Sequence, residues 1–306
     1  MPRNNRRNFD LGSSFQYFTP GMGGSIALLL WLLAGAFLGS MVILLLSSWA
    51  GAPLDSGTTL LISYPLMFVP PLIYASYRSH RNAGFEAGYR LDNKHFSPIG
   101  GAVAAVVVSL ATLAAGFACD AINSIMPPMP TWLEDALNSA TTGNLWTNLL
   151  CVSVMAPLFE EWLCRGMILR GLLNHRSDDG RRMSPAAAII ISALFFGLIH
   201  ANPWQAIPAF ALGCLMGWVY YRTGSLKLTM LMHCVNNTFS VLMSRVDAFQ
   251  DAENWPDVIG WKMYWIVFSA CVLLLILSVR AIRRIPLQGA AGNCDRVGED
   301  FDQVSE

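Results

Sequence analysis

The chain has 306 residues, 54% of them hydrophobic and only 13% charged, with zero formal net charge and a mean hydropathy of +0.44. Soluble proteins carry about a quarter charged residues, so this composition excludes an ordinary soluble domain and indicates a bilayer protein. The zero net charge gives no global basic character, and we therefore expect no nucleic-acid partner. The cysteines form no C-x-x-C pair and most lie in apolar runs, which predicts buried small hydrophobes.

Apolar windows long enough to cross a bilayer core of about 30 Å follow one another along the chain. The eight windows are residues 24–49, 58–77, 98–119, 145–173, 184–200, 204–221, 226–244 and 261–279. Between the third and the fourth, residues 127–144 are compatible with a short helix on the membrane surface or with a polar loop. The sequence therefore predicts an all-α polytopic bundle of about eight transmembrane helices.

Three segments divide the chain. Residues 1–23 are predicted to be a cytoplasmic N-terminal segment, and residues 24–285 a single transmembrane domain. Residues 286–306 are polar and are predicted to be a disordered tail.

Basic residues indicate the orientation of the bundle. Arg and Lys gather at the N-terminus, in the connections 78–94, 176–182 and 222–227, and in the tail, with Arg165 and Arg170 just before the second of these connections. If eight helices alternate, all of these segments lie on one side, and the other side holds only Arg245 and Lys262 among several acidic residues. Cytoplasmic loops carry an excess of Lys and Arg, so we predict that both termini are cytoplasmic.

Ionisable residues deep in a span are costly and mark a functional site by default. Glu161 and Arg165 have the i, i+4 spacing of a helical ion pair, which could join helices or shape a site. Glu160 is rotated by about 100° from Glu161, so it is free to face elsewhere. Pro157 lacks a backbone donor and clashes with the carbonyl of Ser153, which predicts an opened turn beside the glutamates.

Two later windows carry histidines at the same spacing. His233 and Asn237 share one helix face, and Phe196 is placed to shield His200 from lipid. A carboxylate and an imidazole that meet at one water form a general base, and a second imidazole and an amide can stabilise an oxyanion. With Glu160 as the carboxylate, this set suits hydrolysis of a peptide bond.

A zinc ion is an alternative way to activate the water. Glu160, His200 and His233 are an acceptable zinc ligand set with one position open. The sequence shows no carboxylate placed to hydrogen-bond either histidine and orient it as a metal ligand. This favours the metal-independent mechanism. The residues alone leave both mechanisms open.

Three groups of residues resemble the motifs EExxxR, FxxxH and HxxxN of the CPBP intramembrane proteases. These groups are Glu160, Glu161 and Arg165, then Phe196 and His200, and then His233 and Asn237. That family includes the CAAX prenyl endopeptidases and bacterial abortive-infection and bacteriocin-processing proteins, and the resemblance covers about residues 145–240. It implies an eight-helix intramembrane endopeptidase that cleaves a membrane-associated protein or peptide. It also makes the bacterial cytoplasmic membrane the expected location, and it leaves open whether a metal is required.

The resemblance also implies a role for each motif residue. Glu160 and His200 would activate the water, and His233 and Asn237 would stabilise the oxyanion. The site would be shaped by Glu161, Arg165 and Phe196.

Two other functions compete with the protease. The first is a catalytically silent family member that acts as a membrane scaffold or an immunity protein. The second is a transporter with a proton relay, which the lack of a repeat between the two halves of the chain disfavours. Straight helices would place Glu160 about 22 Å from the outer face and His200 at that face. The motifs therefore meet only if the fourth helix continues to about Asn174 or if the fifth is displaced.

Overall fold

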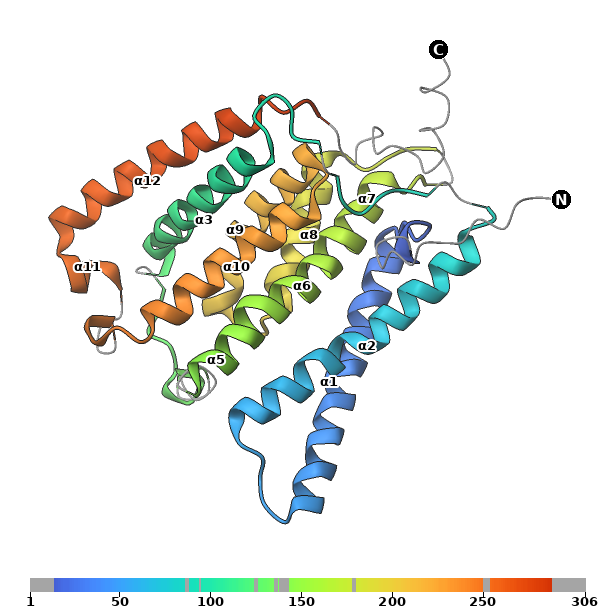
Figure 1. Ribbon diagram of the computed structural model, residues 1–306, viewed down its shortest axis with the longest axis horizontal. Helices are drawn as coiled ribbons and strands as arrows, with labels where there is room; N and C mark the ends of the chain where they lie inside the picture. The colour runs from blue at the N-terminus through green and yellow to red at the C-terminus, as the bar shows by residue number, and fades with distance from the viewer. Residues whose placement is uncertain are drawn as a thin grey trace.

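The computed structural model describes residues 14–85, 88–93, 95–123, 126–134, 137, 143–177, 180–249 and 254–287. Within these ranges the regular elements are helices (Figure 1), and the one extended pairing is an isolated bridge between Arg176 and Arg182. The predicted all-α fold class is confirmed. Residues 1–13 of the expected N-terminal segment and residues 288–306 of the expected tail lie outside the described residues.

Each of the eight apolar windows is helical. Seven windows correspond to α1 (Met22–Ala50), α2 (Ser56–Asn82), α3 (Gly101–Asn123), α8 (Pro185–Leu198), α9 (Pro203–Thr223), α10 (Leu226–Met243) and α12 (Trp261–Ile282). The fourth window is a continuous helical run of α5 (Leu145–Asn148), η2 (Leu149–Met155), α6 (Ala156–Glu161), η3 (Trp162–Leu169) and α7 (Arg170–Asn174). We call this run the central segment (residues 145–174). A 3₁₀ turn, η4 (Asp247–Phe249), and the short α11 (Trp255–Ile259) precede α12.

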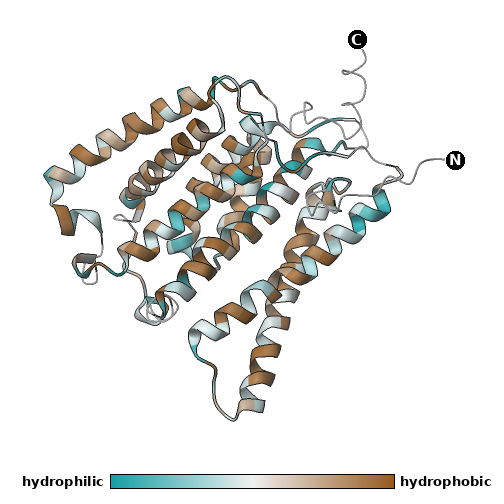
Figure 2. Ribbon diagram, in the orientation of Figure 1, coloured by the Kyte–Doolittle hydropathy of each residue, from teal (hydrophilic) through white to brown (hydrophobic). Residues whose placement is uncertain are grey.

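Four helices in the described part of the chain are long and apolar enough to cross a membrane. They are α1, α2, α12 and residues Gly101–Ile122 of α3, and α8 is a shorter apolar helix. The ribbons of α1 and α12 are coloured mostly hydrophobic (Figure 2), and large apolar side chains on them are exposed, such as Phe37 with 69% of its surface exposed. The chain is thus an integral membrane protein, while eight spans and cytoplasmic termini stay predictions.

The central segment lies in the middle of the bundle. It contacts α1 and α2 on one side and α8, α9 and α10 on the other, while α3 packs between α10 and α12 (Figure 1). Helices packed inside a bundle need less apolar surface than helices facing lipid. This explains why the helices with histidines and asparagines do not reach the hydropathy of α1 or α12.

The connections rich in basic residues meet at one end of the bundle. The backbone N–H of Asn93 donates to the carbonyl oxygen of Gly224 at 3.0 Å, and its side-chain amide donates to Thr223 at 2.9 Å. Arg222 donates to the carbonyl oxygen of Arg283 at 2.6 Å. We call this end, formed by residues 78–85, 88–93, 170–177, 180–182, 222–227 and 280–284, the basic end.

The remaining connections meet at the opposite end. Arg245, just after α10, donates to the carbonyl oxygen of Gly143, just before α5, at 2.8 Å. Trp204 Nε1 at the start of α9 donates to the carbonyl oxygen of Pro127 at 2.8 Å. The segregation of the basic connections that the sequence predicts is therefore present in space.

Caps begin several helices where the sequence offers them. The Asp55 carboxylate accepts hydrogen bonds from the hydroxyl of Thr58 at 2.5 Å and from its backbone N–H at 2.9 Å, and so begins α2. The hydroxyl bond lowers the pKa of Asp55 below its ordinary value. Ser184, Asn202 and Ser225 cap α8, α9 and α10 in the same way.

The 127–144 region is described only in part. Residues 131–134 are helical and Trp132 is exposed, as a surface helix would require. Residues 135–136 and 138–142 lie outside the described residues, so the choice between surface helix and loop stays a prediction.

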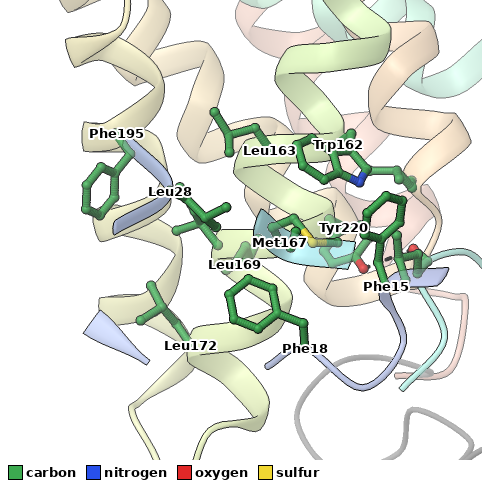
Figure 3. Packing of buried hydrophobic residues seen from close by; sticks show 14 of the residues in the cluster. Phe15, Phe18, Leu28, Trp162, Leu163, Met167, Leu169, Leu172, Phe195 and Tyr220 are labelled. Carbon is green, nitrogen blue, oxygen red and sulfur yellow. Dashed lines mark hydrogen bonds between the residues drawn. The ribbon is translucent and has the colours of Figure 1, made fainter. Parts of the chain in front are cut away.

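A large cluster of buried apolar side chains fills the bundle next to the basic end. Figure 3 shows Leu163, Met167 and Leu169 of the central segment packed with Phe15 and Phe18 from the residues before α1. Gly171 allows this close approach, because a Cβ at that position would lie 2.5 Å from the carbonyl oxygen of Pro20. The segment before α1 is thereby docked onto the central segment.

Arg170 holds this docked segment in place, whereas the sequence marks it only as a basic residue just before a basic connection. Its side chain is fully buried, and its guanidinium donates to five backbone carbonyl oxygens at 2.6–3.2 Å. The acceptors are Gly166, Phe15, Gln16, Phe18 and Tyr89. A guanidinium has five N–H donors, so every one of them is used.

Replacing Arg170 with lysine should therefore destabilise the protein despite the retained charge. An ammonium has three donors in a different geometry, so at least two of the buried carbonyl groups would lose their partner, at about 1–3 kcal/mol each. Thermal unfolding in detergent should show a lower midpoint for Arg170→Lys. Arg176→Lys, at an exposed position of the same connection, is the matched control and should unfold like the wild type. Equal midpoints for both variants would contradict this role of Arg170.

Candidate active site

Two π-helical turns flank the adjacent glutamates. η2 ends at Met155, just before Pro157, and η3 begins at Trp162, just after Glu161. Pro157 has no N–H, so the hydrogen-bond ladder opens in the turn before it, as the sequence predicts. π-helical turns are rare and often occur at functional sites. The two glutamates thus lie on six α-helical residues, Ala156–Glu161, between opened turns.

Glu160 faces a cavity and is held from one side only. The hydroxyl of Tyr64, on α2, donates a short hydrogen bond to its Oε1 atom. Its Oε2 atom is buried, accepts no hydrogen bond from the described residues, and lies 4.0 Å from His233 Nε2. One carboxylate oxygen is therefore fixed by Tyr64, and the other is available to a water or a substrate.

Glu161 points away from the cavity and forms a buried ion pair. Its Oε1 atom accepts a hydrogen bond from Arg165 Nη1 at 2.7 Å, and both side chains are fully buried. The same oxygen lies 3.1 Å from His233 Nδ1. Arg165 Nη2 donates to the carbonyl oxygen of Gly213 on α9 at 3.0 Å. The pair therefore joins the central segment to both α9 and α10.

Phe196 lies between the charged pair and the two histidines. The guanidinium of Arg165 lies over its ring at 4.5 Å, a cation–π contact. The rings of His200 and His233 meet it edge-on, with centroid distances of 5.2 and 5.3 Å. Gly213 makes room for this ring, because a Cβ there would lie 3.2 Å from it. Phe196 therefore positions both imidazoles, which goes beyond the shielding of His200 expected from spacing.

His200 is fixed at the turn between α8 and α9. Its Nδ1 lies 2.8 Å from the carbonyl oxygen of Phe196. A carbonyl only accepts, so Nδ1 carries the proton and Nε2 of the neutral ring is an acceptor. Ala201, the next residue, has a φ of +56°, and Asn202 donates to the His200 carbonyl oxygen at 2.9 Å. A left-handed non-glycine residue costs about 1–2 kcal/mol, so the turn that aims His200 is strained.

Asn237 joins the central segment across the site. Its Nδ2 donates to the carbonyl oxygen of Val152 in η2 at 2.8 Å, and its Oδ1 accepts from Asn236 at 3.1 Å. A carboxamide has two N–H donors, so one donor remains for another group. The opened turn at η2 brings the Val152 carbonyl within reach of α10.

These side chains surround a cavity of about 550 Å³. Its walls come from α2, the central segment, α8, α9 and α10, and Glu160, His200, His233 and Asn237 all line it. The central segment continues to Asn174, as the depth argument requires. The structure therefore brings together the four residues predicted to be catalytic, with Phe196 also lining the cavity and Glu161 and Arg165 behind it.

Three features of the site were not foreseen. The contact of Tyr64 with Glu160 joins residues 96 positions apart, and no spacing within one helix indicates it. Glu160 was expected to act beside His200, but its nearest imidazole among the described residues is that of His233. The Glu161 carboxylate contacts the ring of His233, and the sequence did not reveal this contact.

The residues that could hold a metal do not converge. Nowhere in the described ranges do three His, Cys, Asp or Glu side chains come together as a metal-binding group. Glu160, His200 and His233 share the cavity, yet Glu160 is drawn towards Tyr64. The donor set therefore does not fit zinc in this conformation, although the Glu161–His233 contact is of the kind that supports a ligand histidine.

Comparison with known proteins identifies the region around this cavity. A family model described as type II CAAX prenyl endopeptidase Rce1-like matches residues 142–239, which include all three motifs. No curated protein and no solved structure gives a significant match. The matched range contains the central segment, α8, α9 and most of α10, and it leaves out Tyr64 and the α1–α2 pair.

Proposed function

We propose that the chain is an intramembrane endopeptidase of the CPBP family, because residues 142–239 match the model of the type II CAAX prenyl endopeptidases. Its substrate is a membrane-associated protein or peptide, and the reaction is hydrolysis of a peptide bond by an activated water. The protein acts within a lipid bilayer, which we place in the bacterial cytoplasmic membrane.

One observation carries this proposal: the two adjacent glutamates have different partners. Glu161 is fully buried and paired with Arg165, whereas Glu160 lines the cavity with one unpartnered oxygen. Each of the two carboxylates has one buried oxygen without a hydrogen-bond partner among the described residues, but only Glu160 lines the cavity. A general base needs one oxygen open to the proton that it removes.

The polar groups around the cavity supply the roles of amide hydrolysis. Glu160 Oε2 and the acceptor atom of His200, Nε2, hold a water between them and take up its proton. The free N–H of the Asn237 amide donates to the oxyanion that forms on the substrate carbonyl. His233 donates from Nε2 when both ring nitrogens carry protons, with Nδ1 held by Glu161. Tyr64 keeps the Glu160 carboxylate in place.

A catalytically silent scaffold is the alternative function within the same family. It would keep the Glu161–Arg165 pair, which stabilises the bundle, but it would not need a second carboxylate that lines the cavity. The open carboxylate beside two imidazoles therefore favours the enzyme.

Replacing Glu160 with glutamine should abolish turnover without unfolding the protein. The carboxamide is isosteric but cannot take a proton, and loss of a general base lowers rates by about 10²- to 10⁴-fold. Comparative proteomics of membranes would compare a strain lacking the protein with strains that carry the wild type or Glu160→Gln. Substrates should accumulate uncut in the null strain and in the Glu160→Gln strain alike.

Glu161→Gln is the matched control for this experiment. It leaves Arg165 as an unpaired buried cation, and breaking a buried pair costs about 3–5 kcal/mol. This variant should therefore show reduced membrane accumulation and a lower unfolding midpoint. Equal protein levels and equal activity for the two variants would defeat the division of roles.

Activity should survive removal of metal ions, because the cavity side chains do not form a ligand group. The purified protein would be dialysed against a chelator for a prolonged period and assayed before and after addition of zinc. We expect unchanged turnover in both samples. Near-stoichiometric zinc in the active protein, lost together with activity in His200→Ala, would establish the metal-dependent mechanism instead.

A further inference from the structure

The cavity extends from Glu160 towards one end of the bundle only. On the central segment, the lining residues are Cys151, Val152, Ala156 and Glu160, and its residues 162–174 do not line the cavity. This segment runs from the opposite end of the bundle at Leu145 to the basic end at Asn174. The cavity therefore extends from Glu160 towards the end that lacks the basic connections.

The lining residues of α10, α2 and α9 lie towards the same end of the bundle, although these helices run in alternating directions. On α10, lining begins at His233 and continues to Ser244, away from Lys227 at the basic end. On α2, only Leu60 and Tyr64 line the cavity, in the half of the helix farthest from its basic last turn. On α9, lining residues run from Trp204 to Met216, and Arg222 lies beyond them.

The exposure of the polar lining residues increases in the same direction along α10. His233 has 3% of its surface exposed. Asn236 and Asn237, one turn later, are half-buried. Ser240 and Ser244, farther along the same lining face, are exposed. The mouth of the cavity is therefore at the C-terminal end of α10, where Arg245 reaches Gly143.

The side towards the basic end is closed by packed side chains. Leu163, Met167 and Ile168 follow the glutamates on the central segment and are completely buried. Phe68 of α2 and Leu226 of α10 belong to the same cluster, which also holds the docked residues before α1 (Figure 3). A polypeptide could not reach Glu160 from the basic end without displacing this cluster.

We propose that the cavity opens to the outer, non-cytoplasmic face of the membrane and takes its substrate from that side. The basic connections lie together at the other end, and such connections stay in the cytoplasm. This inference rests on the proposed endopeptidase function and deepens it. The substrate class is a polypeptide whose scissile bond lies at or just beyond the outer face, such as an exported peptide that is still membrane-associated.

The lining also specifies the side chains of the bound segment. Towards the mouth, the described lining residues are neutral: Leu60, Leu137, Trp204, Gln205 and Ser244. They provide apolar contacts and a few hydrogen-bond partners, with no acidic or basic group to pair a charge. The bound segment therefore carries apolar or neutral side chains, because an unpaired charge inside the cavity would be costly.

Cysteine accessibility tests the side of the mouth without any need for activity. Ser244→Cys would report on the mouth, Ala52→Cys on the α1–α2 connection, and Ser177→Cys on an exposed position of the basic end. Each would be made in a background whose native cysteines are replaced by alanine. A membrane-impermeant maleimide would be added to right-side-out and to inverted membrane vesicles.

Residues 244 and 52 should be labelled in right-side-out vesicles, and residue 177 only in inverted ones. Labelling of residue 244 only in inverted vesicles would overturn the inference and leave the proposed reaction untouched. Residues 52 and 177 must also be labelled from opposite sides of the membrane. Labelling of both residues from one side would equally overturn the inference.

A second experiment follows the substrate. Two single-span reporter proteins would carry the same neutral, apolar segment, one on the outer side of the membrane and one on the cytoplasmic side. Only the outer reporter should be cut, and Glu160→Gln should abolish that cut. Cutting of the cytoplasmic reporter would overturn the inference. Cutting of neither reporter, together with outer labelling of residue 244, would count against the proposed reaction and support the outer mouth.

Discussion

The buried ion pair between Glu161 and Arg165 is the interaction on which the site depends. At 2.7 Å and without exposure to solvent, it neutralises two charges that neither lipid nor an apolar core would accept singly. The same groups contact His233, Phe196 and Gly213 from three other helices. The pair holds Glu161 away from the cavity, whereas its neighbour Glu160 lines the cavity, and its Oε2 atom accepts no hydrogen bond from the described residues. The two adjacent glutamates therefore lie in different environments, because successive residues of an α-helix are rotated by about 100°.

The bundle divides into a packed half and an open half. Near the basic end, the apolar cluster and the five hydrogen bonds of Arg170 hold the segment before α1 against the central segment. Beyond Glu160, five helices part to enclose the cavity. The packed half holds Glu160 in place, and the open half gives access to it. The proposed hydrolysis needs both, since water and a polypeptide must reach a carboxylate fixed within the bundle.

Much of this site could be predicted from the sequence, because spacing within one helix determines which residues share a face. The Glu161–Arg165 pair and the opened turn before Pro157 follow from local rules. The extension of the central segment to Asn174 is one of the two ways in which the motifs could meet. Contacts between distant segments could not be predicted in this way. Tyr64 reaches Glu160 from another helix, and Arg170 binds backbone carbonyls that carry no sequence signature. In the sequence, Arg170 indicated only the orientation of the bundle, whereas its hydrogen bonds make it a buried structural residue.

A double-mutant cycle tests the separation of the two glutamates most directly. Unfolding free energies in detergent would be measured for Glu161→Gln, Arg165→Met and the double variant, and for the matching cycle with Glu160→Gln. Residues in direct contact couple by about 0.5–3 kcal/mol, whereas independent sites add to within about 0.5 kcal/mol. We expect strong coupling between Glu161 and Arg165 and near-additivity between Glu160 and Arg165. Equal coupling in the two cycles, or strong coupling only for Glu160, would contradict the assignment of Glu161 to the ion pair and Glu160 to the cavity.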